Sequence, residues 1–195
     1  MMERTSVVSR NTKETEIQIS LNLDGSGKAD IQTGIGFFDH MLNSFARHGF
    51  FDLTVKVKGD LEVDTHHTIE DTGIVLGQAI KQAVGDKKGI VRYGSQILPM
   101  DESLVLCALD LCGRPYLVYD LGLDREKVGD LETEMVREFF YAVSYAAEMN
   151  LHIRQMAGMN NHHIIEAAFK AFAKALDSAV AAEPRLTGVL STKGS

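Results

Sequence analysis

Two short blocks of this chain carry a pair of histidines followed three residues later by a glutamate. They are His66-His67-Thr68-Ile69-Glu70 and His162-His163-Ile164-Ile165-Glu166. On a helix, positions i and i+4 share a face, and position i+1 is rotated by about 100°. Each block therefore presents one His and the Glu to one point and its second His to a neighbouring point. Because His with Glu suits divalent cations such as Mn, Fe, Co, Ni or Zn, the two blocks predict a two-metal site.

A simpler explanation is that both blocks are histidine-rich turns on surface helices. A single block would fit that explanation well. Two blocks with identical spacing hold four of the seven histidines of a 195-residue chain, and this repetition favours metal binding.

Composition limits the class of protein. A chain of 195 residues with 45% apolar residues fits one ordinary domain or two small similar halves. Its apolar runs fall short of the ~20 residues of a membrane helix, and its start lacks a signal peptide, so we expect a cytoplasmic protein with no membrane partner. The net charge of −7 argues against a nucleic-acid partner. Cys107 and Cys112 are expected to be thiols rather than a disulfide or a zinc knuckle.

The first half of the chain predicts the order strand, helix, strand, helix. The expected elements are a β-hairpin with strands at 16–23 and 28–33, a helix at 37–48, a strand at 53–57 and a helix at 66–84. Gly49 is predicted to close the first helix in a left-handed conformation. Thr65 is predicted to be the N-cap of the second helix.

The second half predicts a similar succession. The expected elements are strands at 104–111 and 116–121 joined by a turn at 112–115, a helix at 131–149, a strand at 151–153 and a helix at 162–182. Helix, strand and His-His-x-x-Glu thus recur with a period near 96 residues, which indicates a duplicated unit. We predict an α+β fold of two tandem similar halves, 1–90 and 91–195. Each half is a small mixed or antiparallel sheet backed by two helices, and together they form one compact unit.

Aligning the halves adds one ligand to each metal set. Asp39-His40-Met41-Leu42 matches Arg137-Glu138-Phe139-Phe140, which puts a donor 26 residues before the first His pair and 24 before the second. His152 competes with Glu138 for this role, although a hydrogen-bonded structural histidine explains it equally well. The predicted metal ligands are His40, His66, His67, Glu70, Glu138, His162, His163 and Glu166.

Longer motifs extend over nearly the whole chain. They are RNTKET, GIGFFDHML, HHTIEDTGIVLGQA, PMDE, CGRPYLVYDL, LHIRQMAG, NHHIIEAAFKAFAKAL and STKG. With these motifs the chain resembles the imidazoleglycerol-phosphate dehydratase family of histidine biosynthesis. The resemblance implies two tandem copies of an α+β unit, two Mn²⁺ ions per active site, and a shell of 24 identical subunits with active sites at subunit boundaries. The family commonly has His at the position of Glu138, but Mn²⁺ also accepts carboxylate oxygen.

The resemblance also implies a reaction, the dehydration of D-erythro-imidazole glycerol phosphate to imidazole acetol phosphate. The carbon-bound proton that leaves is not acidic, because no carbonyl adjoins it. A cation on each ring nitrogen would make the ring an imidazolate that expels the neighbouring hydroxyl. His66, Glu70, His162 and Glu166 would hold these cations, and Glu14 corresponds to the family's catalytic, substrate-contacting carboxylate. Taken alone, Glu14 is an exposed charge.

The substrate's phosphate requires cationic and hydroxyl donors. For Lys170 an ion pair with Glu166 is the alternative, and Arg92 and Arg114 could equally be surface charges. Asp71 is predicted either to orient His67 or to be an acid favoured in the first turn of its helix. The residues that match the family's phosphate-binding positions are Arg92, Arg114, Lys170, Ser191, Thr192 and Lys193.

Two other functions remain open from the residues alone. A dinuclear metallohydrolase acting on a phosphorylated small molecule would use similar donors, with Asp60, Asp64, Asp101 and Asp110 as further candidates. A non-enzymatic, metal-stitched assembly is the second. Ferritin-like proteins, however, place Glu-x-x-His on long bundle helices, whereas this chain is rich in strands.

Overall fold

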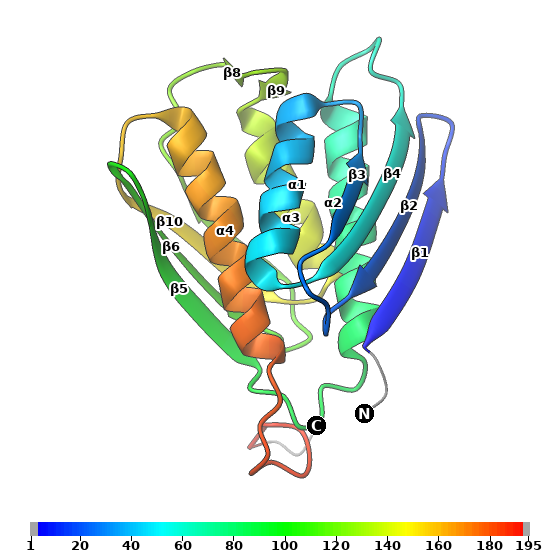
Figure 1. Cartoon of the computed structure of the whole chain (residues 1–195), viewed down its shortest axis with the longest axis vertical. Helices are drawn as coiled ribbons and strands as arrows, with labels where there is room; N and C mark the ends of the chain where they lie inside the picture. The colour runs from blue at the N-terminus through cyan, green and yellow to red at the C-terminus, as the bar shows by residue number, and fades with distance from the viewer. Residues whose placement is uncertain (1–3, 193–195) are drawn as a thin grey trace.

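The computed structural model describes residues 4–192, in which two four-stranded sheets enclose four helices (Figure 1). The first sheet has the strand order β1-β2-β4-β3, and β3 is parallel to β4 while the other pairs are antiparallel. The elements of this half are β1 (Thr5–Asn11), β2 (Thr15–Asn22), β3 (Ala29–Gln32), α1 (Gly36–Gly49), β4 (Asp52–Gly59) and α2 (His66–Val84).

The second half repeats this topology. Its sheet has the order β5-β6-β10-β7, with β7 parallel to β10. Its elements are β5 (Tyr93–Met100), β6 (Ser103–Asp110), β7 (Tyr116–Asp120), α3 (Glu134–Ala146), β10 (Asn150–Ala157) and α4 (Asn161–Val180), with a small hairpin of β8 (Lys127–Val128) and β9 (Leu131–Glu132) before α3. The predicted α+β fold of two similar halves is confirmed, whereas the boundary at residue 90 stays a prediction.

The core forms between the sheets, and the helices of the two halves interlock there. Helix α1 packs on α4, and α2 packs on α3. The rings of Phe45 and Phe172 stack at 5.3 Å across the first pair. In the second pair, Gly77 brings the backbones together, since a Cβ there would lie 2.6 Å from the carbonyl oxygen of Val143. The helices that carry the two His-His-x-x-Glu blocks therefore each lie against a helix of the other half.

The predicted hairpin at 16–33 is wrong. Strand β4 lies between β2 and β3, and the antiparallel neighbour of β2 on its other side is β1, which the sequence pattern did not reveal. Leu53 and Val55 of β4 are fully or almost fully buried, whereas β3 buries little of its surface. Burial of apolar side chains gives β4 the central position and leaves the short β3 at the edge.

One predicted helix cap lies at a different residue, and the other lacks a side-chain hydrogen bond to its helix. The left-handed residue after α1 is Phe50, with φ of 59°, rather than Gly49. Gly49 remains in the helix, where a Cβ would lie 2.2 Å from the ring of Phe51. Thr65 is the N-cap residue of α2, as predicted, but its hydroxyl donates to Glu132, and the carboxylate of Asp64 instead accepts from the amide of His66 at 2.8 Å.

Helices within residues 4–192 are all too short or too polar to cross a membrane.

Candidate active site

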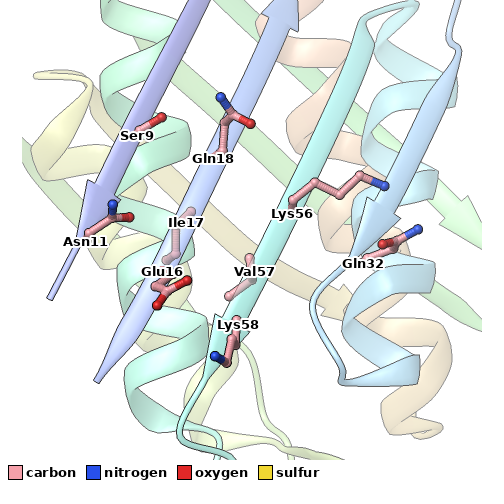
Figure 2. Close-up of a pocket in the computed structure, with 9 residues that line it drawn as sticks. All are labelled: Ser9, Asn11, Glu16, Ile17, Gln18, Gln32, Lys56, Val57 and Lys58. Atoms are coloured by element: carbon pink, nitrogen blue, oxygen red, sulfur yellow. The ribbon is translucent and has the colours of Figure 1, made fainter. Parts of the chain in front are cut away.

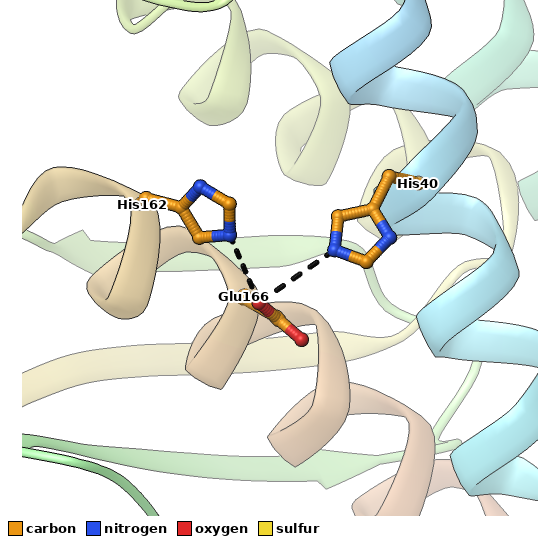
Figure 3. Close-up of side chains that lie close together, drawn as sticks. All are labelled: His40, His162 and Glu166. Atoms are coloured by element: carbon orange, nitrogen blue, oxygen red, sulfur yellow. Dashed lines mark hydrogen bonds and ion pairs between the residues drawn. The ribbon is translucent and has the colours of Figure 1, made fainter.

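His40, His162 and Glu166 converge at the contact between α1 and α4 (Figure 3). Nε2 of His162 lies 3.1 Å from Oε2 of Glu166, and Nε2 of His40 lies 3.7 Å from the same oxygen. Within residues 4–192 these are the side chains whose donor atoms gather as a group of three, all within 4.8 Å of one another. Two imidazole nitrogens and a carboxylate form a donor set that fits a divalent transition metal.

The buried carboxylate of Glu166 is held in its ionised form. Its side chain is only 9% exposed, and burial alone would raise its pKa. The ammonium of Lys170 nevertheless donates to Oε1 at 2.7 Å, and this hydrogen bond and charge leave the pKa below its usual value. Glu166 is thus ready to bind a cation through Oε2. The ion pair with Glu166, which was the alternative explanation for Lys170, is thus present.

His66 and Glu70 form the corresponding pair on α2. Nε2 of His66 lies 3.3 Å from Oε2 of Glu70, and both side chains are about half exposed. Glu138 stands on α3, which packs against α2 as α1 packs against α4. Its carboxylate, however, accepts from Arg137 at 2.7 Å rather than joining the pair. Within residues 4–192 no third donor gathers with this pair, and His40, which the alignment of the halves grouped with it, lies beside His162 and Glu166 instead.

The second histidine of each block meets a carboxylate. Asp60 was predicted only as a further donor of a metallohydrolase, and Glu102 was not predicted at all. Nδ1 of His67 lies 2.9 Å from Asp60, and Nδ1 of His163 lies 2.7 Å from Glu102. These hydrogen bonds raise the pKa of both imidazoles. A proton kept on Nδ1 leaves Nε2 free to bind a metal, which is the usual arrangement at histidine ligands.

Each of these histidines also has a second acid near Nε2. Glu14 lies 3.8 Å from Nε2 of His67, and Asp101 lies 3.5 Å from Nε2 of His163. Both acids are on the turns that join the first two strands of their sheets. The hydroxyl of Thr12 accepts from the amide of Glu14 at 3.1 Å and shapes the first turn. Glu14, which lies far from the His-His-x-x-Glu blocks in sequence, is therefore next to one of them in space.

Asp71 does not orient His67. Its carboxylate is buried and accepts from the hydroxyl of Thr15 at 2.6 Å and from Arg10 at 2.5 Å. It therefore ties β1 and β2 to α2 beneath the turn that carries Glu14.

His152 lies apart from the other donors. It is exposed on β10, while its neighbours Leu151 and Ile153 are fully buried. Because side chains alternate along a strand, His152 points to the outer face of the sheet, away from α3 and α4.

A cavity of about 610 Å³ brings together four of the predicted phosphate-binding residues. Arg92 is positioned there by two hydrogen bonds to Asp110, one of them at 2.7 Å from Nε. Lys193 lies outside the described residues. The lining residues include Arg92, Tyr93, Cys112, Arg114, Leu190, Ser191 and Thr192.

This cavity is far from the His40 cluster of the same chain. The amide of Arg92 donates to the carbonyl of Ala179 at 2.8 Å, near the end of α4, whereas His162 lies in its first turn. The rise of an α-helix separates His162 from Ala179 by about 25 Å. Figure 1 shows these two ends of α4 at opposite ends of the molecule.

A second cavity, of about 460 Å³, lies beside the cluster itself. His40, Glu166 and Lys170 line it together with Arg47 and His48, which the sequence analysis missed. Burial and then the nearby charge of Lys170 lower the pKa of His48. Arg47 follows His40 by two helical turns, a spacing that could have identified it as facing the same side of α1.

A further hollow, of about 430 Å³, lies over the outer face of the first sheet (Figure 2). Polar side chains such as Gln18, Gln32 and Lys56 line it. It contains none of the predicted site residues, and its lysine and amide groups are poor metal ligands.

Comparison with known proteins identifies the family of the chain. A profile of the family described as imidazoleglycerol-phosphate dehydratase matches residues 33–176. The enzyme of that name from Lachnoclostridium phytofermentans is 70% identical over 193 residues, covering 99% of this chain and 98% of its own. The chain belongs to the imidazoleglycerol-phosphate dehydratase family.

Crystal structures of the family support the fold. The dehydratase from Staphylococcus aureus superposes with a TM-score of 0.83 at 42% identity, covering 91% of this chain and 99% of that one. The Pyrococcus furiosus structure gives 0.83 at 35% identity, covering 96% and 99%. The predicted family is confirmed, and membership makes the chain an enzyme, a hydro-lyase with the dehydratase activity of histidine biosynthesis.

Proposed function

We propose that the chain dehydrates D-erythro-imidazole glycerol phosphate to imidazole acetol phosphate with two Mn²⁺ ions per active site. The observation that carries the proposal is the convergence of His40, His162 and Glu166 from both halves of the chain. Imidazole and carboxylate donors of this kind suit a metal of borderline softness. The resemblance between the two halves supports a second, related ion near His66 and Glu70.

The chain's own residues would hold and orient these ions. Asp60 and Glu102 keep the proton of their histidines on Nδ1, so that Nε2 of His67 and of His163 remains available. When bound, the two ions would supply Lewis-acid chemistry at the nitrogens of the substrate's imidazole, which makes loss of the neighbouring hydroxyl easier.

Proton transfer falls to Glu14. Its carboxylate is half exposed and lies on a short turn beside His67. A carboxylate placed there can take the proton from the carbon that follows the one losing its hydroxyl, which gives an enol, and can return a proton to the carbon beside the ring as the enol becomes the ketone. The network of Thr12, Thr15 and Asp71 holds this turn against α2.

In this proposal, the phosphate-binding residues around Arg92 come from a second chain. Three carbons join the ring to the phosphate ester of the substrate, a span far shorter than the length of α4 that separates the Arg92 cavity from His162. One chain therefore cannot bind the ring of a substrate molecule near His162 and the phosphate of the same molecule in its Arg92 cavity. The proposal is that Arg92, Arg114, Ser191, Thr192 and Lys193 of a neighbouring copy complete a site whose metal ligands and Lys170 come from this chain.

Subunit mixing tests both parts of the proposal. His162→Ala and Arg114→Gln should each lose activity on imidazole glycerol phosphate. When the two variants are dissociated and reassembled together, sites that combine an intact Arg114 with an intact His162 should recover activity. If the mixture reassembles, as verified by its size, but does not recover activity, then the sites are not shared between chains. Turnover without bound transition metal would refute the metal proposal.

A further inference from the structure

The hairpin of β8 and β9 belongs to a segment that has a much shorter counterpart in the first half. Residues 33–35 join β3 to α1, whereas residues 121–133 join β7 to α3. Figure 1 shows the hairpin at the same end of the molecule as the starts of α1 and α4. The extra length therefore lies where the helices with the proposed metal ligands begin.

Asp130, at the tip of this hairpin, caps α1. The N-cap residue of α1 is Ile35, which has no side chain able to accept a hydrogen bond. The two oxygens of Asp130 accept from the amides of Gly36 at 2.6 Å and Phe37 at 3.0 Å. A carboxylate at a helix N-terminus satisfies free amides and interacts well with the helix dipole.

The capped turn leads directly to the donor cluster of His40, His162 and Glu166. The ring of Phe37 packs edge-on against His162 at 5.0 Å, and it also faces His40 at 6.3 Å. Gly129 has a φ of 61°, and a Cβ there would lie 3.3 Å from Cβ of Phe37. The glycine lets the hairpin approach this ring closely while Asp130 holds the backbone beneath it.

The same segment contacts two other helices near their starts. Glu132 accepts from the hydroxyl of Thr65, which precedes His66. At the start of α4, Asn161 donates to Asp124 at 2.6 Å and accepts from the amide of Arg125 at 3.2 Å. Residues 124–132 thus contact the starts of all three helices on which His40, His66 and His162 lie.

We propose that Asp130 is a positioning residue for the donor cluster of His40, His162 and Glu166. By anchoring the first turn of α1, it sets the distance of His40 from His162 and Glu166. The inference rests on the proposed function, since it assumes that these three residues bind a metal.

Mn²⁺ release from the assembled holoenzyme to a competing chelator tests this role, together with the visible absorption spectrum of the Co²⁺-substituted enzyme. Asp130→Ala should weaken Mn²⁺ binding roughly tenfold and alter the Co²⁺ spectrum, as expected when a ligand loses its support. Asp130→Asn, which keeps one acceptor oxygen, should fall between this variant and the unmodified enzyme. It also serves as the test if the alanine variant fails to fold.

Asp52→Ala is the matched control. Asp52 also binds two backbone amides, those of Ser26 at 2.8 Å and Lys28 at 3.0 Å, but it lies at the far end of α1. Its loss should leave Mn²⁺ affinity and the Co²⁺ spectrum unchanged. Unchanged affinity and spectrum in both Asp130 variants would overturn the inference. If the unmodified enzyme binds no metal, the proposed function fails first and this inference fails with it.

Discussion

His40 and Glu166 belong to different halves of the chain, yet Nε2 of His40 lies 3.7 Å from Oε2 of Glu166. The contact exists because α1 of the first half packs on α4 of the second. A donor cluster that depends on both halves makes the relative position of the two repeats part of the site. Changes at the interface between α1 and α4 should therefore affect metal binding as well as stability.

Replacing Glu14 with Gln should leave the fold and metal content intact but reduce turnover by a factor of about 10² to 10⁴, the range typical of a lost acid/base group. The amide keeps the shape of the side chain and cannot take a proton. Glu16→Gln, two residues along on the exposed face of β2, is the control and should retain normal kcat. Normal turnover in the Glu14 variant would remove this residue from the mechanism.

His162→Ala should lower the affinity for one Mn²⁺ ion by about a hundredfold or more, since losing a ligand should reduce metal affinity at least as much as losing a group that supports a ligand. Metal analysis of the purified protein and chelator competition measure the change. His152→Ala, on the outer face of β10, should keep full metal content. A loss of metal from the His152 variant instead would mean that this histidine is a ligand in the assembled enzyme.

Asp60→Asn should lower the pKa of His67. The carboxylate of Asp60 raises this pKa in the folded protein. The hydrogen bond between Asp60 and protonated His67 therefore contributes its full stability below the ordinary imidazole pKa of about 6.5, and this contribution is lost as pH rises through the raised pKa of His67. NMR titration of the metal-free protein should give His67 a midpoint above the ordinary value, and the variant should move it down. An unchanged His67 midpoint would contradict the assigned hydrogen bond.

Gly77→Ala should destabilise the protein by about 1–3 kcal/mol, the usual cost of overpacking. A Cβ at this position would lie 2.6 Å from the backbone oxygen of Val143 and 2.7 Å from Ala146, so α2 and α3 would have to separate. Thermal unfolding measures the loss. Gly188→Ala, where an added Cβ meets nothing within 4 Å, should leave the unfolding temperature nearly unchanged.

Local features of the site could be predicted from the sequence because they depend on the helix alone. The i, i+4 spacing of His66 and Glu70, and of His162 and Glu166, puts each pair on one face in any α-helix. The predicted helices agree closely with α1, α2 and α4 for the same reason, since their apolar residues follow the helical period. Motif resemblance predicted the family, which the comparisons confirm, and Glu14 was proposed from that resemblance.

Only the tertiary structure decided which distant groups meet. Burial of Leu53 and Val55 placed β4 between β2 and β3, against the local turn signal at 24–27. Packing of α1 on α4 places His40 beside Glu166. Loops between other elements carry Asp60 and Glu102, which contact the histidines, and Asp130, which caps α1. Such contacts join residues far apart in sequence, and their choice depends on how the whole core is filled, which no short spacing of residues encodes.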